Sequence, residues 1–230
     1  MVFHGFQKMT LLDFPGKVAC TAFTGGCNLR CPFCHNALLV TEIDNSATID
    51  GSEIIGFLKK RQGLLDGICI TGGEPMLQNG LMDFICEIKQ MGYAVKLDTN
   101  GSFPDKLKAL VKENLLDYVA VDIKNSKEKY AQTVGVKDYD ISAIEETVDF
   151  LLQGNVDFEF RTTVVKELHT VQDIEKICQW IKGAPRYFLQ NFTDSGNVIG
   201  DNLHEVGKEE MFKMADISKK YIINTEVRGI

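Results

Sequence analysis

The sequence predicts an α/β fold built on a parallel sheet, because strand-like apolar runs alternate with helix-like apolar stripes along the whole chain. Connections of this length join parallel strands by right-handed crossovers, and about six such βα units can be recognised. This alternation excludes a helical bundle and a β-sandwich. A chain of 230 residues is most simply one domain, residues 1–230.

The strands are predicted from runs of apolar and β-branched residues bounded by glycine, proline or charged residues. In chain order they are residues 18–23, 67–71, 93–98, 118–123, 158–165, 186–192 and 221–227. Helices are predicted where apolar residues recur every three or four positions. They are residues 52–61, a helix from residue 81 that ends before Gly92, residues 104–113 with Pro104 in the first turn, a long helix through residues 144–151, and residues 171–182 and 208–219.

Charge and hydropathy exclude several classes of function. A net charge of −7 with dispersed lysines argues against a surface for DNA or RNA. Residues 1–16 contain neither a basic segment followed by an apolar core nor a long apolar run, so no signal peptide or membrane span is expected. We therefore expect a cytoplasmic protein without nucleic-acid or membrane partners.

The segment at residues 24–36, TGGCNLRCPFCHN, places Cys27, Cys31 and Cys34 in C-x3-C-x2-C spacing. Thiolates hold iron–sulfur clusters, and a cubane normally takes four, so three cysteines leave one iron open to another ligand. An open coordination position is what metal catalysis requires. The alternative is a structural zinc site with His35 as the fourth ligand, although His35 follows Cys34 so closely that the tetrahedron would be cramped.

The remaining cysteines are interpreted as core residues. An odd total of seven suits a reducing compartment and metal ligation better than a disulfide framework. Cys69 lies in a predicted strand and Cys178 on an apolar helical stripe. Cys20 precedes the cysteine loop, and a strand position explains it better than a redox role.

Polar residues and glycines follow the predicted strands, where the chemistry of parallel α/β folds gathers. The second strand ends in TGGEP at residues 71–75, the third in DTNG at 98–101, and the fourth in DIKNS at 122–126, while the fifth carries Arg161. Each motif alone could be a plain turn, and Lys124 alone a solvated cation. Their convergence at successive strand ends favours a functional site.

The cysteine loop, with aromatic Phe33 just before its last cysteine, resembles the cluster loop of the radical S-adenosylmethionine (SAM) superfamily. The continuation CPFCHN and the leader TLLDFPGKVACTAFTGG resemble the activating enzymes of glycyl radical enzymes, most closely those of anaerobic ribonucleoside-triphosphate reductase. The resemblance implies an incomplete, TIM-like (β/α)6 barrel with a parallel sheet open along one side. Periodicity alone does not separate that barrel from a doubly wound sheet.

The resemblance also implies which residues bind SAM. The backbone at Gly72 and Gly73 would contact the methionine amino group. Phe33 would lie against the adenine, while the backbone around Cys34 and His35 reads the edge of the base. For His35 the alternative is a hydrogen bond that braces the loop.

Charged side chains at the strand ends have implied roles as well. Lys124 would meet the SAM carboxylate. Glu74 would either support the methionine ammonium or shape its turn. Arg161 projects from an apolar strand and is too costly to bury unpaired, so it would contact SAM or an acidic partner group, with a structural salt bridge as the alternative.

A monovalent cation near SAM is a further implication of DTNG and DIK. The ligands carried over by motif are Asp98, Thr99 and Asp122, with a backbone carbonyl at Ala120. Two neighbouring carboxylates repel one another unless a cation lies between them, and oxygen ligands suit a hard cation. His4, His169 and His204 match no motif and are expected at the surface.

The reaction that the resemblance implies begins with SAM chelating the open iron of a [4Fe–4S] cluster. An electron from flavodoxin or ferredoxin would cleave SAM and yield a 5′-deoxyadenosyl radical. This radical would abstract hydrogen from a glycine of a partner enzyme, and the resemblance makes anaerobic ribonucleotide reductase the first candidate. Alternatives are an activase of pyruvate formate-lyase or another glycyl radical enzyme, and a radical SAM enzyme acting on a peptide or small molecule. A structural zinc protein or an electron-transfer cluster protein is the non-enzymatic alternative.

Overall fold

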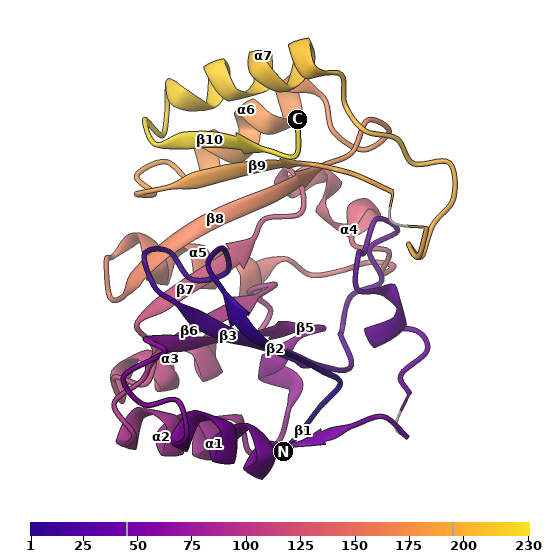
Figure 1. Ribbon diagram of the computed structural model, residues 1–230. Coiled ribbons are helices and arrows are strands. Elements are labelled where there is room, and N and C mark those ends of the chain that lie inside the picture. The colour runs from indigo at the N-terminus through magenta and orange to yellow at the C-terminus, as the bar shows by residue number, and fades with distance from the viewer. Residues whose placement is uncertain (45, 195) are drawn as a thin grey trace. The chain divides into compact units, whose positions relative to one another are not determined.

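The computed structural model describes residues 1–44, 46–194 and 196–230, and its contacts divide the chain into two compact units. Unit 1 comprises Met1–Asn28, Leu38–Thr99 and Phe103–Val119. Unit 2 comprises Leu29–Ala37, Asn100–Ser102 and Ala120–Ile230. Each unit consists of strands covered by helices (Figure 1). That the whole chain is one domain stays a prediction.

Unit 1 contains a mostly parallel set of strands. In spatial order they are β2 (Gly5–Thr10), β3 (Ala19–Thr24), β5 (Gly67–Gly72) and β6 (Ala94–Thr99). β3, β5 and β6 run parallel, whereas β2 is antiparallel to β3. A separate antiparallel pair joins β1 (Val2–Phe3) to β4 (Ile49–Asp50). The helices are α1 (Gly51–Lys59), α2 (Leu81–Gln90) and α3 (Pro104–Lys112), with short 3-10 turns η1 (Ala37–Leu39), at the border of the two units, and η2 (Pro75–Leu77).

The two faces of the strands in unit 1 differ in polarity. One face carries Ile68 and Ile70 of β5 and Val95 and Leu97 of β6, all fully buried. The other face carries an apolar cluster of Phe14, Ala19 and Tyr118, packed against Ala94. Next to that cluster, a row of aligned residues crosses the strands, namely Thr21, Cys69 and Lys96. The polar side chains of Thr21 and Lys96 therefore lie on the same face of these strands.

Unit 2 carries the later strands and helices. The end of β7 (Tyr118–Asp122) lies beside β8 (Asp157–Val164), followed by β9 (Tyr187–Asn191) and β10 (Thr225–Arg228). β8, β9 and β10 are parallel. Figure 1 shows α6 (Val171–Trp180) and α7 (Lys208–Lys219) beside β9 and β10. The other helices are η3 (Lys127–Lys129), α4 (Tyr130–Thr133) and α5 (Ser142–Leu152).

The predicted strands and helices all occur, with bounds close to those expected from sequence. The last strand is the exception, because it begins at Thr225 and not at residue 221. The amides of Tyr221 and Ile222 both donate to the carbonyl of Ser218, so these residues extend the turn that ends α7. Sequence analysis missed β1, β2, β4 and α4, which are short or largely exposed. In the described part of the chain, no helix combines the length and apolar character needed to cross a bilayer.

The glycine pair after β5 packs directly against the start of the cysteine loop. The Gly73 amide donates to the Thr24 carbonyl at 2.8 Å, and the Glu74 amide to the Gly26 carbonyl at 2.7 Å. A β-carbon on Gly73 would lie 2.0 Å from the Gly26 oxygen. Gly72 has a φ of 115°, and a β-carbon there would lie 2.4 Å from the Thr24 oxygen. Both glycines are therefore required by close backbone approach, and not only by turn geometry.

Replacing Gly73 with alanine should destabilise the protein by about 3 kcal/mol, at the top of the range for overpacking, because the clash is with backbone that cannot rotate away. Gly56, inside α1, is the matched control, since a β-carbon there meets nothing within 4 Å. Gly56→Ala should be neutral or stabilise the protein by up to about 1 kcal/mol. Denaturant unfolding of both variants measures the difference, and equal stabilities would contradict this account of the turn.

Candidate functional site

The cysteine loop is distributed over both units, with Cys27 in unit 1 and Cys31 and Cys34 in unit 2. None of the three is in a disulfide. The Cys34 amide donates to the Cys31 carbonyl at 3.1 Å, so one turn presents these two thiols. Over the described residues, no three His, Cys, Asp or Glu side chains already stand as a metal-binding group. The thiol donor set has the chemistry that an iron–sulfur cluster requires, and the three-cysteine site stays a prediction.

Backbone contacts in unit 2 hold the loop around Cys31. The Arg30 amide donates to the Val134 carbonyl at 2.9 Å. Gly135 follows in the left-handed region, with a φ of 66°, and a β-carbon there would lie 2.2 Å from the Arg30 oxygen. The segment after α4, which sequence analysis left unassigned, therefore positions the middle of the cysteine loop.

The aromatic residues of the loop are anchored within unit 2. Phe33 is only 3% exposed, and its ring meets His169 edge-on at 6.4 Å between centroids. His35 stacks on Phe192 at 5.5 Å, and its Nε2 lies 3.0 Å from the carbonyl oxygen of Thr193. His35 thus makes the bracing hydrogen bond that was expected as its alternative role. Contact between Phe33 and adenine stays a prediction.

Asp122, at the end of β7, forms an ion-paired triad with Lys124 and Arg161. Lys124 Nζ donates to Asp122 Oδ2 at 3.0 Å, and Arg161 Nε donates to Oδ1 at 2.9 Å. Arg161 therefore makes the salt bridge that was its alternative assignment. Two cationic side chains share one carboxylate, so the three groups of this triad together carry one excess positive charge.

Electrostatics keep all three members of this triad charged. Burial alone would raise the pKa of Asp122, but Arg161 and then Lys124 outweigh it and hold that pKa well below its usual value. Burial alone would lower the pKa of Lys124, but electrostatic interaction with Asp122 above all, and then with the Cys31 sulfur, raises it well above its usual value. Lys124 is therefore a fixed cation, suited to an anionic ligand group.

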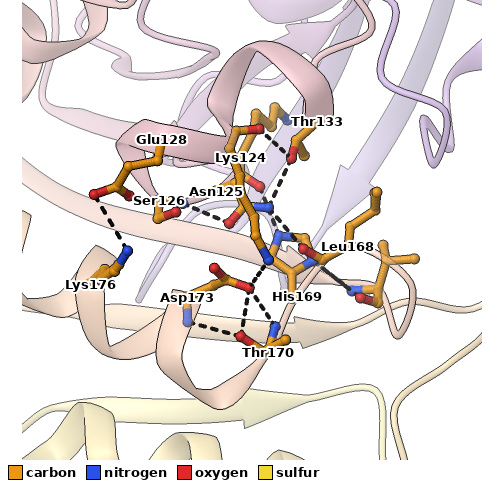
Figure 2. Close-up of polar contacts among 12 residues, drawn as sticks. Lys124, Asn125, Ser126, Glu128, Thr133, Leu168, His169, Thr170, Asp173 and Lys176 are labelled. Carbon is orange, nitrogen blue, oxygen red and sulfur yellow. Dashed lines mark hydrogen bonds and ion pairs between the residues drawn. The ribbon is translucent and has the colours of Figure 1, made fainter.

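Figure 2 shows how the backbone that follows Lys124 is braced. His169 Nε2 donates to the Lys124 carbonyl at 2.8 Å, and its Nδ1 accepts from the Val165 amide at 3.0 Å. The neighbouring Asn125 donates to Thr133 Oγ1 at 2.8 Å and to the Leu168 carbonyl at 3.0 Å. The expectation that His169 lies at the surface was wrong, since it is 3% exposed. No short-range pattern signalled its role, because the Lys124 carbonyl that it braces belongs to a segment 45 residues away.

The other histidines differ from His169. His204 is largely exposed, and its Nδ1 lies 2.8 Å from Glu167, as expected for a surface residue. His4 is half-buried beside Gly25, where a β-carbon would lie 2.6 Å from the imidazole Nδ1. It therefore packs against the start of the cysteine loop and is not a surface residue.

Glu74 shapes the turn after β5. The side chain is fully buried, and its Oε1 accepts from the Met76 amide at 3.1 Å, which caps η2. The same oxygen accepts from the Thr99 hydroxyl at 2.9 Å. Glu74 thus makes the contacts of its turn-forming role, and its support of the methionine ammonium stays a prediction. The same carboxylate joins the second and third strand ends.

Lys96 is a charged residue that sequence analysis missed. It is 1% exposed, lies in the middle of β6, and forms an ion pair with Asp98. The signal was present in the sequence, since a lysine two positions before an aspartate in a strand shares its face. The flanking Val95 and Leu97 mark that strand as buried.

Ala120, the predicted carbonyl ligand of the cation, is a buried residue of β7.

Three of the four cysteines outside the loop are core residues, as expected, whereas Cys86 is only partly buried. Cys20, Cys69 and Cys178 are fully buried. Burial raises the pKa of the Cys20 thiol to about 12 and that of Cys178 to about 11. Both therefore stay protonated and unreactive at neutral pH.

The brace at Lys124 should make stability depend on pH. Burial lowers the pKa of His169 below 6.5, so the unfolded chain takes up the proton first. The free energy of unfolding therefore has its full value above about pH 6.5 and decreases as the pH falls below that value. Unfolding of the wild type and of His169→Gln is measured from pH 7.5 to 5.5, about one pH unit on either side of the ordinary histidine pKa. The free energy of unfolding should decrease less in the variant over this range. An unchanged slope in His169→Gln would contradict the assignment.

Comparisons with known proteins show the family to which the chain belongs. Residues 21–181 match the radical SAM superfamily. A Methanocaldococcus jannaschii protein, MJ1227, whose name places it among the glycyl-radical enzyme activating enzymes, is 34% identical over 98% of this chain and 95% of its own length. The pyruvate formate-lyase-activating enzyme of Staphylococcus aureus is 28% identical over 143 residues, 57% of each chain.

Solved structures show the same fold. SuiB of Streptococcus suis, crystallised with S-adenosylmethionine, has a TM-score of 0.71 and 14% identity, covering 90% of this chain and 49% of its own. Proteins of this superfamily use a [4Fe–4S] cluster and SAM. The expected radical SAM fold is confirmed, with a mostly parallel sheet. This chain belongs to the radical SAM superfamily and, within it, to the glycyl-radical enzyme activating enzymes.

Proposed function

We propose that this protein installs a glycyl radical on a partner enzyme, and that the partner is an anaerobic ribonucleoside-triphosphate reductase. The observation that carries the proposal is the similarity to a glycyl-radical enzyme activating enzyme over 98% of this chain. The leader at residues 10–36 adds the choice of reductase, through its resemblance to the activases of that enzyme.

Cys27, Cys31 and Cys34 hold the [4Fe–4S] cluster in this proposal. When bound, the cluster supplies the electron that cleaves SAM, delivered from flavodoxin or ferredoxin. The protein's own task is to orient SAM and to keep water away from the radical until a partner glycine is in place.

Lys124 binds the SAM carboxylate in this proposal. The support is its positive charge, its pairing with Asp122 at 3.0 Å, and the pairing of Arg161 with the same carboxylate, which gives the triad one excess positive charge. Asp122 and the His169 brace act as positioning residues, because they hold the Lys124 ammonium and backbone without needing to touch SAM.

The glycine pair binds the methionine amino group through its carbonyl oxygens. An ammonium only donates hydrogen bonds, so its partners must be acceptors. The amides of Gly73 and Glu74 are already committed to the Thr24 and Gly26 carbonyls. This leaves carbonyls as the backbone groups of the right polarity for the ligand.

Pyruvate formate-lyase is the second candidate partner. The 28% identity to the activating enzyme from Staphylococcus aureus favours it, although that match covers 57% of this chain. Both candidates require the same chemistry at a partner glycine, so only the choice of protein substrate separates them.

Anaerobic incubation of the reduced, cluster-loaded protein with SAM and each candidate partner tests the proposal. The expected result is a glycyl doublet in the electron paramagnetic resonance spectrum of the reductase, which is lost when the radical-bearing glycine of the reductase is replaced by alanine. A doublet on pyruvate formate-lyase alone would move the assignment to the second candidate. SAM cleavage without a radical on either partner would refute the proposal.

A matched pair of lysine variants tests how SAM is held. Lys124→Met should weaken SAM binding by about tenfold or more, because it removes a charge-assisted hydrogen bond. Lys127→Met is the control, since Lys127 lies in the same segment, is about half exposed and pairs with Glu145. Equal SAM affinities for the two variants would contradict the role of Lys124.

A further inference from the structure

The ion pair between Lys96 and Asp98 lies within unit 1 on a single strand. The two residues are two positions apart on β6, so their side chains share one face of the sheet. The Lys96 side chain is 2% exposed and that of Asp98 is 13% exposed. An ammonium this deeply buried is stable only when paired, and Asp98 supplies the charge.

The surroundings of Lys96 fix where its ammonium lies. Lys96 aligns with Cys69 on β5, and its Nζ lies 3.9 Å from the Cys69 sulfur. Cys69 in turn aligns with Thr21 on β3. The apolar cluster of Phe14, Ala19 and Tyr118 occupies the same face earlier along the strands. The aliphatic part of the Lys96 side chain therefore lies next to an apolar layer, and its ammonium lies toward the carboxyl end of β6, where it pairs with Asp98.

This arrangement disagrees with the monovalent cation implied by family resemblance. Asp98, one of the expected carboxylate ligands, already pairs with the Lys96 ammonium. Asp122, the other, pairs with Lys124 and Arg161. Thr99 donates its hydroxyl to Glu74. A metal cation is attracted to uncompensated carboxylates, and both candidates here are neutralised by the protein's own cations, so this donor set does not fit a bound Na⁺ or K⁺.

We propose that the Lys96 ammonium takes the place of a monovalent metal cation at Asp98, so that this protein needs neither Na⁺ nor K⁺ to bind SAM. An ammonium carries the same single charge and adds directed N–H donors, but it is fixed to β6 and cannot be lost by dilution. The part of the inference that concerns SAM affinity rests on the proposed function. The part that concerns Asp98 rests on unit 1 alone.

The test compares three proteins in sodium, potassium and choline chloride at equal ionic strength, each cluster-loaded under anaerobic conditions. They are the wild type, Lys96→Met, which leaves Asp98 without its ammonium, and the double variant Lys96→Met/Asp98→Asn, which removes both charges. Lys89→Met controls for loss of an ion pair elsewhere in unit 1, because Lys89 pairs with Asp117 at 2.7 Å. The readouts are the thermal unfolding midpoint without SAM and the SAM dissociation constant.

For the wild type, the double variant and Lys89→Met, neither the unfolding midpoint nor the SAM affinity of each protein should change from one salt to another. Lys96→Met should be stabilised by Na⁺ or K⁺ relative to choline, and its SAM affinity should recover by about tenfold, as mass action at a vacated cation site predicts. A wild type that needs Na⁺ or K⁺, or a folded Lys96→Met that ignores them, would overturn the proposal.

Two features keep the test decisive. If Lys96→Met does not fold in any salt, the salt dependence of the wild type alone decides the outcome. The midpoint without SAM involves neither SAM nor a partner enzyme. Failure to form a glycyl radical would therefore sink the proposed function while leaving the assignment of Lys96 standing.

Discussion

The close backbone contact between the glycine pair after β5 and residues 24–26 is the constraint on which the site in unit 1 depends. It fixes the start of the cysteine loop to a central parallel strand without using any side chain. Because the contact consumes amides, it also leaves carbonyls as the backbone groups at this strand end that can accept from a ligand. Glu74 extends the same constraint to the next strand through Thr99.

Charge pairing organises the rest of the strand ends. Asp98 and Asp122 each have a cationic partner from their own unit, and Asp122 has two. Removing one member of a buried pair typically costs about 3–5 kcal/mol, because the remaining charge is left without compensation. The Asp122 triad carries an excess of positive charge, which suits an anionic group of a ligand. The Lys96 pair is balanced, which suits a structural or cation-replacing role.

Sequence patterns predicted the alternating strands and helices because each helix and strand buries an apolar face with its own period. They also marked Gly72, Gly73, Asp122 and Lys124, whose residue types are informative at a strand end. They failed for His169, because the Lys124 carbonyl that it braces lies 45 residues away in the sequence and its other partner, the Val165 amide, is a backbone group that residue type does not reveal. They failed for β2, whose exposed residues give no alternating pattern. Lys96 could have been found by reading the lysine in VKLD as a buried partner of the aspartate.

The central claim is that Cys27, Cys31 and Cys34 hold a [4Fe–4S] cluster with one iron open to SAM. The most direct measurement is the iron content after anaerobic reconstitution, together with the electron paramagnetic resonance spectrum of the reduced protein with and without SAM. The account predicts about four irons per chain and a spectrum that changes when SAM is added. Zinc in place of iron, an unchanged iron content in Cys31→Ala, or a spectrum indifferent to SAM would contradict it.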